Sequence, residues 1–202
     1  EVYCAVGIHP EAIDEVSIEE GIKELKELAK DPKVKAIGEI GIDRYWIKDE
    51  DVINKQIEYF IKQVELANEL GLPVIIHDRE AHGITLDILK NHTPKFGGVL
   101  HCFSGSIEFM NEILKLGLYI GLDGPVTWKN ASLPKEIAKA VPLDRLVVET
   151  DSPYMTPSPN RGKINYPHYV KYVIEEIAKI RENISREIEE ATYDNGRRLF
   201  KI

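Results

Sequence analysis

The sequence has few cysteines and no long hydrophobic run. Its 202 residues include two cysteines, which form no CxxC pair and give no disulfide framework. No apolar stretch approaches the roughly 20 residues that are needed to span a bilayer. We therefore expect a chain without a membrane-spanning segment, and the sparse cysteines favour a reducing, cytoplasmic location.

Several functional motifs are also missing. The chain contains no GxxxxGK[ST] or GxGxxG sequence, so use of a nucleotide cofactor is not supported. It contains no GxSxG sequence, the mark of one class of serine hydrolase. The formal net charge of -8 argues against a broad basic surface that wraps duplex DNA. It leaves open a nuclease in which bound cations screen a phosphate locally.

What the sequence does contain is an alternation of short apolar runs with helical patterns. The expected strands are Val2–Ile8, Val34–Ile40, Pro73–His77, Gly98–Cys102, Leu118–Leu122 and Arg145–Glu149. Such βα alternation predicts an α/β fold with a parallel sheet, in one domain. Six strands would fill an open doubly wound sheet, whereas a closed TIM barrel has eight βα units and about 250 residues.

Metal-capable side chains close four of these apolar runs. Glu39 lies in AIGEIGID, His77 in PVIIHDR, His101 in GGVLHCFSG and Asp151 in LVVETDSP. The carboxyl ends of barrel strands converge on one face, where active sites lie. Imidazole and carboxylate groups bind divalent cations, and a carboxylate also accepts a proton from water. The pattern thus predicts metal-assisted hydrolysis.

Each of these residues also has a simpler interpretation. Taken singly, Glu39 could cap a strand, His77 could be a hydrogen-bonded histidine, and Asp151 could begin a turn. Arg79 and Ser104 are secondary candidates for holding an anionic group, and Arg79 could equally pair with a carboxylate.

Local patterns add three expectations around these residues. Gly38 and Gly41 are expected to leave open space beside Glu39 for a metal or substrate. Strand alternation places Glu149 on the same face as Asp151. The same alternation points Cys102 away from its neighbour His101 and into the core.

The ordered set of motifs resembles the TatD family of metal-dependent deoxyribonucleases, which are amidohydrolase-like TIM barrels. The matching segments, in order, are GIHP, GEIGID, IHDR, HCFSG, ETDSPY and the final NGRRLF. The resemblance runs the length of the chain and implies a divalent-metal hydrolase that cleaves phosphodiester bonds in DNA. About six of the eight βα units of such a barrel are visible.

Residue roles follow from this resemblance by position. Glu39 resembles the carboxylate that bridges two metals, and His77 and His101 resemble the ligands of the second metal. Asp151 resembles a ligand of the first metal that also takes the proton of the attacking water. His9, in GIHP, lies near the pocket of such a fold. The resemblance implies two divalent ions (magnesium, zinc or manganese), a DNA substrate that is single-stranded or offers an end, and no obligate protein partner.

The chain departs from the family pattern in two places. It has no H-x-H pair, which supplies two first-metal ligands on the first barrel strand of the family. We therefore expect residues 1–202 to form a single TatD-like domain that is incomplete at its amino end. In the long loop, RGKINYP stands where relatives tend to have RGKRNEP, so Ile164 and Tyr166 replace charged residues.

Two alternatives compete with the nuclease hypothesis. One keeps the fold and changes the substrate, to the ester or amide bond of a small metabolite or an aminoacyl-tRNA, in line with the acidic net charge. The other is a truncated, inactive barrel, because half of one metal site is missing and strands would be left at an open edge.

Overall fold

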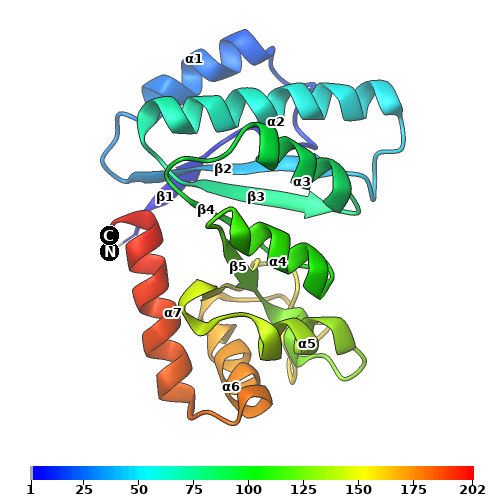
Figure 1. Ribbon diagram of the computed structural model, residues 1–202, viewed down its shortest axis with the longest axis vertical. Helices are drawn as coiled ribbons and strands as arrows, with labels where there is room; N and C mark the ends of the chain where they lie inside the picture. The colour runs from blue at the N-terminus through cyan, green and yellow to red at the C-terminus, as the bar shows by residue number, and fades with distance from the viewer. Residues whose placement is uncertain (1) are drawn as a thin grey trace. The chain divides into compact units, whose positions relative to one another are not determined.

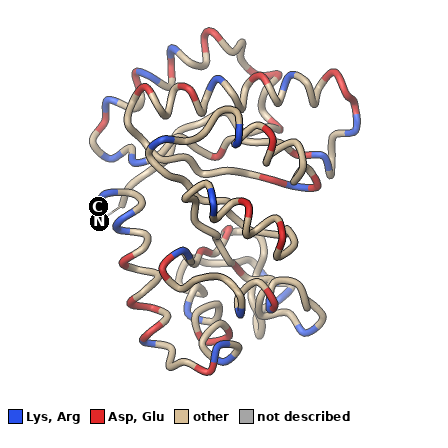
Figure 2. Tube along the Cα trace, viewed as in Figure 1, with Lys and Arg blue, Asp and Glu red and all other residues tan. Residues whose placement is uncertain are grey.

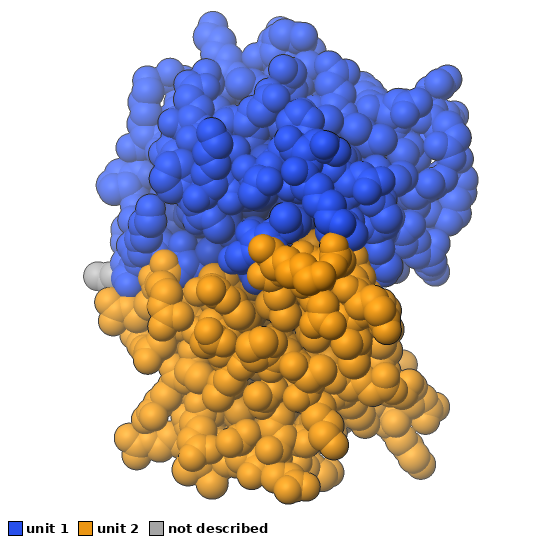
Figure 3. Space-filling view, in the orientation of Figure 1, with its two compact units in different colours: residues 1–100, 116–118, 199–202 blue, residues 101–115, 119–198 orange. Residues whose placement is uncertain are grey.

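The computed structural model describes residues 2–202 and divides into two compact units (Figure 3). The first unit comprises residues up to Leu100 together with Leu116–Leu118 and Leu199–Ile202. The second comprises His101–Lys115 and Tyr119–Arg198. Within residues 2–202 there are six strands, as the sequence predicts, and they alternate with helices.

Four parallel strands form the sheet of the first unit (Figure 1). They lie in sequence order and are β1 (Cys4–Val6), β2 (Val34–Asp43), β3 (Val74–Arg79) and β4 (Gly98–Leu100). Strand β2 is mostly buried on both faces, as its continuous apolar run predicts, whereas β3 is fully buried only at Val74 and Ile76. Ile37, Ile40 and Ile76 are each 0% exposed.

Three helices belong to this unit, namely α1 (Ile18–Leu28), α2 (Glu50–Leu70) and α3 (His82–Asn91). A capping box starts α1, because the Ser17 hydroxyl accepts from the backbone N–H of Glu20 and donates to its carboxylate. Gly71 ends α2 in the left-handed conformation that glycine favours.

Helix α2 packs on β2 with a face that includes polar side chains. Helical spacing of the apolar residues would place Ile57 and Ile61 on its core face, yet both are only partly buried. Gln56 and Gln63 are instead 0% exposed and share the buried face with Phe60. Hydropathy alone therefore assigns the wrong residues to the buried face of α2. The two glutamines are buried because they hydrogen-bond the backbone that carries the candidate site.

The second unit contains the parallel pair β5 (Tyr119–Leu122) and β6 (Leu146–Val148). Its helices are α4 (Ile107–Lys115), α5 (Ser132–Ala140), α6 (Val170–Arg181) and most of α7 (Ser185–Phe200). Short 3₁₀ turns lie at Gly124–Thr127, Leu143–Arg145 and Pro167–Tyr169. Helix α6 packs against α5 and β6, and its Val173 and Ile177 are 0% exposed.

No helix within residues 2–202 has both the length and the apolar character needed to cross a membrane. Acidic and basic residues are interspersed along α1 and α2, as Figure 2 shows.

Candidate metal centre

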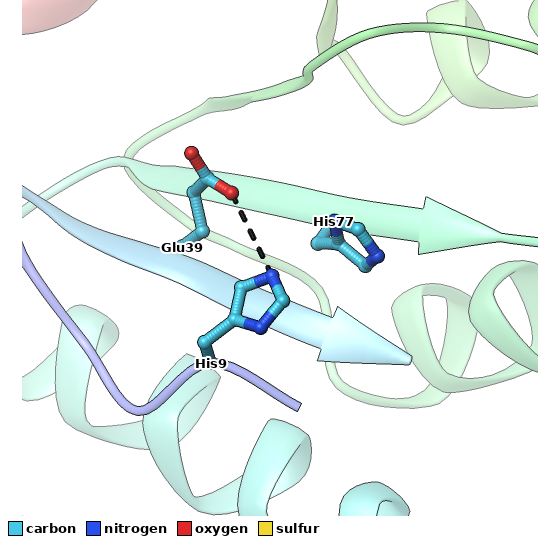
Figure 4. A group of neighbouring side chains, drawn as sticks. All are labelled: His9, Glu39 and His77. Atoms are coloured by element: carbon cyan, nitrogen blue, oxygen red, sulfur yellow. Dashed lines mark ion pairs between the residues drawn. The ribbon is translucent and has the colours of Figure 1, made fainter. Parts of the chain in front are cut away.

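In the first unit, three metal-capable side chains meet beside β2 and β3 (Figure 4). Glu39 lies on β2, His77 lies on β3, and His9 lies in the loop that follows β1. One ligand atom from each lies within 4.8 Å of the others. Parallel pairing places β2 beside both β1 and β3, so Glu39 and His77, two of the four strand-end residues, lie together with His9.

The geometry of this group leaves it accessible to solvent. His9 Nε2 lies 3.8 Å from Glu39 Oε2, and these side chains are 32% and 40% exposed. The rings of His9 and His77 meet edge to face, with 4.7 Å between their centroids. The His77 side chain is 15% exposed. Two imidazoles and one carboxylate thus lie together, and all three side chains are partly exposed.

Asp43 holds the His77 ring from behind. Its Oδ2 lies 3.1 Å from His77 Nε2, and its side chain is 0% exposed. Its Oδ1 accepts backbone N–H groups from Tyr45 at 2.8 Å and Trp46 at 3.1 Å. Metal-binding histidines usually place their second ring nitrogen against such a carboxylate, which fixes the ring orientation and makes the ligand more basic.

The buried glutamines of α2 hold the backbone of the His9 loop. Gln63 accepts the N–H of Ile8 at 2.6 Å and donates to its carbonyl at 3.1 Å. Gln56 donates to the Pro10 carbonyl at 3.2 Å and accepts the N–H of Asp43 at 3.1 Å. Both residues that flank His9 are therefore fixed to one helix.

The glycines beside Glu39 serve strand packing, and the expectation of open space beside them was wrong. A Cβ on Gly38 would lie 2.6 Å from Ile75 Cβ. A Cβ on Gly41 would lie 1.9 Å from the His77 carbonyl oxygen, and its φ of +146° disfavours other residues. These glycines let β2 approach β3 closely, so the space is already filled by β3.

In the second unit, Asp151 lies with two residues that follow other strands. Ligand atoms of Asp151, Cys102 and Asp123 all lie within 4.8 Å of one another. The Cys102 Sγ donates to Asp123 Oδ2 at 3.4 Å. The prediction that Cys102 points into the core was therefore wrong. Strand β4 ends at Leu100, and Cys102 has a φ of +45°, so strand alternation no longer governs its direction.

Burial dominates the electrostatics of this second group. It raises the pKa of the Asp123 carboxyl to about 8, and the carboxylates of Glu149 and Asp151 push the pKa in the same direction. It also raises the pKa of the Cys102 thiol, again with help from these neighbouring carboxylates. A cation bound here would relieve this concentration of negative charge.

His101 lies beside Glu149 in the same unit. Its Nδ1 lies 4.0 Å from Glu149 Oε2, and its side chain is 7% exposed. The other Glu149 oxygen accepts the backbone N–H of Cys102 at 2.5 Å. Gly121 makes this approach possible, since a Cβ there would lie 2.6 Å from Glu149 Oε1. Ser104 is exposed in the loop before α4.

Arg79 contacts aromatic rings. Its guanidinium carbon lies 4.0 Å from the centroid of the Tyr45 ring and 5.5 Å from that of Trp46. Of the two roles predicted for this residue, pairing with a carboxylate is not realised among residues 2–202.

Asp123 and Asp43 were not predicted as parts of a site. Asp123 closes the apolar run Leu118–Leu122 in the same way that His101 and Asp151 close theirs, so the strand-end signal was present in the sequence. Asp43 lies in the same motif as Glu39, but its contact with His77 depends on strand register and could not be read from the sequence.

Three comparisons with known proteins agree. The family model described as TatD related DNase matches residues 1–201. A Bacillus subtilis protein named uncharacterized metal-dependent hydrolase YabD is 47% identical, over 100% of this chain and 78% of that protein. The crystal structure of YJJV, a TatD homologue from Escherichia coli, superposes with a TM-score of 0.92 at 32% identity, over 99% of this chain and 77% of that one.

A more distant relative extends the agreement. A hydrolase TatD family protein from Entamoeba histolytica superposes with a TM-score of 0.84 at 25% identity, over 99% of this chain and 75% of that one. These likenesses confirm the predicted fold class, which is α/β of the TIM-barrel type.

Proposed function

This chain belongs to the TatD family of metal-dependent hydrolases, and on that premise we propose that it is a deoxyribonuclease that hydrolyses phosphodiester bonds. The observation that carries the proposal is the convergence of His9, Glu39 and His77, with Asp43 behind the His77 ring. A carboxylate behind a ligating histidine is typical of metal ligand sets, which supports this proposal.

The donor atoms of this group fit a divalent cation. Two imidazoles and a carboxylate suit zinc, manganese or a similar ion better than magnesium, which prefers oxygen ligands. We assign Glu39, His77 and His9 as its ligands. A bound cation would lower the pKa of a water molecule and neutralise negative charge on the phosphate.

In the second unit we assign metal-ligand roles to Asp151 and His101. Asp151 is also the proposed base. Its carboxylate accepts a proton from the attacking water while the water oxygen bonds to phosphorus and one ester P–O bond breaks. The leaving oxygen then takes up the proton that Asp151 received, so the products are an alcohol and a phosphomonoester. Asp123 joins Asp151 in our assignment because the two carboxylates lie in one group.

Anion-binding roles are assigned to Arg79, Ser104 and His9. Arg79 carries a permanent charge and has no carboxylate partner within residues 2–202, so its charge is available to a phosphate. Ser104 is exposed and offers a hydroxyl donor. Beyond its ligand role, the His9 side chain is 32% exposed, so it can approach a substrate oxygen.

Replacement of Glu39 tests the proposal. The Glu39→Ala variant should lose roughly 100-fold or more of the metal-dependent cleavage of a single-stranded oligonucleotide, and its bound metal should fall when measured by mass spectrometry. Glu27→Ala is the matched control, because Glu27 is an exposed carboxylate that pairs with Lys30. Unchanged cleavage by Glu39→Ala would refute the assignment.

The acidic net charge of -8 favours a second candidate, an ester or amide hydrolase whose substrate is not a long polyanion. The interspersed charges of α1 and α2 agree with it (Figure 2). A panel of single-stranded DNA, aminoacyl-tRNA and lactone substrates separates the two. Turnover of a lactone or an aminoacyl ester, without cleavage of DNA, would replace the nuclease proposal.

A further inference from the structure

Two exposed aromatic side chains follow directly after β2. Tyr45 is 42% exposed and Trp46 is 66% exposed. Their rings meet edge to face, with 4.6 Å between centroids. Arg79, at the end of the adjacent strand β3, lies 4.0 Å from the Tyr45 centroid. The three side chains form a surface that combines π faces with a positive charge, which we call the aromatic platform.

The aromatic platform is tied to the proposed metal ligands through one carboxylate. Asp43 accepts the backbone N–H groups of Tyr45 and Trp46 with one oxygen, and its other oxygen contacts His77. The strand pairing places Arg79 opposite Asp43. In addition, Arg44 donates its backbone N–H to the Arg79 carbonyl at 2.8 Å. A single buried group therefore fixes both the platform and a metal-capable histidine.

The ion pairs around the aromatic platform indicate which basic side chain is available to bind an anionic ligand. Arg44 pairs with Glu50 at 2.5 Å, and Lys48 pairs with Glu80 at 3.2 Å. Arg79 has no such carboxylate within residues 2–202. Its guanidinium can hydrogen-bond a phosphate while it remains over the Tyr45 ring.

We propose that Tyr45, Trp46 and Arg79 form a subsite for an unpaired nucleotide, in which Trp46 stacks on the base and Arg79 contacts the adjoining phosphate. This inference rests on the proposed nuclease function and names the feature of DNA that the enzyme recognises. Stacking on an aromatic side chain needs a base whose face is free, and bases within a duplex are already stacked. The subsite therefore selects single strands and frayed ends.

The test compares an oligothymidylate with the same strand that carries one abasic residue, moved position by position. For the wild type, an abasic residue at the subsite should raise KM on the order of ten-fold. In Trp46→Ala, the KM for the intact strand should rise by a similar factor. The KM of this variant should no longer differ between the intact and the abasic strand. Trp46→Phe should restore much of the discrimination, because a phenyl ring also stacks.

Phe96→Ala is the matched control. Phe96 is 42% exposed and has Lys201 over its ring at 5.3 Å, so it is the same kind of aromatic–cation pair. It precedes β4, whereas Tyr45 and Trp46 follow the carboxyl end of β2. Its loss should leave KM and the abasic discrimination unchanged. If Trp46→Ala discriminates as strongly as the wild type, the subsite is refuted.

A binding measurement separates the subsite from the nuclease proposal. In a Trp128→Phe background, Trp46 is the remaining tryptophan, and its fluorescence should be quenched by intact oligothymidylate in chelator. The strand with the abasic residue should bind on the order of ten-fold more weakly, with the Kd taken from the quenching. Quenching without cleavage would support the subsite and refute the nuclease. Cleavage without selective quenching would refute the subsite alone, and absence of both would refute both.

Discussion

The Asp43 carboxylate and the His77 imidazole are in hydrogen-bond contact, 3.1 Å apart, with Asp43 completely buried. Because Asp43 has no exposed side-chain area, its contact with His77 is not weakened by competition with water. We infer that Asp43 acts as a positioning residue that sets the direction of the His77 ring.

Asp43→Asn tests this role. The amide retains the shape of the side chain and loses its negative charge, so it supports His77 less well as a ligand. We expect metal affinity to fall about 10- to 100-fold, measured by calorimetric titration with Zn²⁺ or Mn²⁺. Asp14→Asn, which removes an exposed carboxylate that pairs with Lys55, should leave the affinity unchanged. Equal affinity in wild type and Asp43→Asn would show that the contact only supports the fold.

Gln63→Met tests how α2 fixes the His9 loop. Methionine has a similar volume but leaves the buried N–H and carbonyl of Ile8 without their partner. Unpaired buried groups cost about 1–3 kcal/mol each, so urea unfolding should show a loss in that range or above it. Metal affinity should fall too, because the loop that carries His9 is released.

The control for Gln63 is Asn68→Ala. Asn68 makes the same kind of two-point contact, to the Thr93 carbonyl and the Lys95 N–H, but these hydrogen bonds are exposed. Water can replace them, so the loss of stability should be smaller and metal affinity should not change. A Gln63→Met variant with wild-type metal affinity would show that the loop is held by other contacts.

Gly41→Ala tests the close approach of β2 to β3. The added Cβ would lie 1.9 Å from the His77 carbonyl oxygen at a φ of +146°. Backbone strain of about 1–3 kcal/mol adds to overpacking of about 1–3 kcal/mol, so we expect a loss of about 3 kcal/mol or more in denaturant unfolding. Gly83→Ala is the control, because a Cβ there meets nothing within 4 Å and favours the α3 helix. A small loss of stability in Gly41→Ala would mean that β2 and β3 move apart easily.

The sequence identifies the candidate site residues at strand ends better than it identifies the buried residues that hold them in position. Glu39 and His77 could be identified because each closes an apolar run, and β2 and β3 run to or beyond both residues. Gln56 and Gln63 could not be identified from the sequence, because helical periodicity assigns polar residues to the solvent side. Their burial depends on backbone groups brought in by β1 and β2, which are contacts between segments far apart in sequence.

Asp123 and Cys102 show where strand alternation stops being informative. Asp123 carries the same signal as the residues that were identified, since it follows the buried run of β5. Cys102 lies beyond the end of β4 in a left-handed conformation, where alternation does not apply. The contact between Cys102 and Asp123 joins residues that follow two different strands. The effect of these surroundings on the pKa of Asp123 can be measured.

Asp123→Asn tests the effect of burial on the carboxyl. Because burial raises the folded-state pKa to about 8, above that of the unfolded chain, the protonated carboxyl stabilises the fold at low pH. This stabilisation is fully present below about pH 4 and is lost as pH rises through about 8. Asparagine does not ionise, so in chelator the variant should gain thermal stability over wild type progressively from pH 5 to pH 9.

Asp144→Asn, at an exposed aspartate of the same unit, should show a pH dependence like that of wild type. Parallel Tm curves for wild type and Asp123→Asn would mean that the Asp123 carboxyl titrates in its ordinary range. Divalent metal provides a second measurement. If Asp123 is a ligand, added Zn²⁺ or Mn²⁺ at pH 9 should raise the Tm of wild type more than that of Asp123→Asn, because only the carboxylate gains a cation partner.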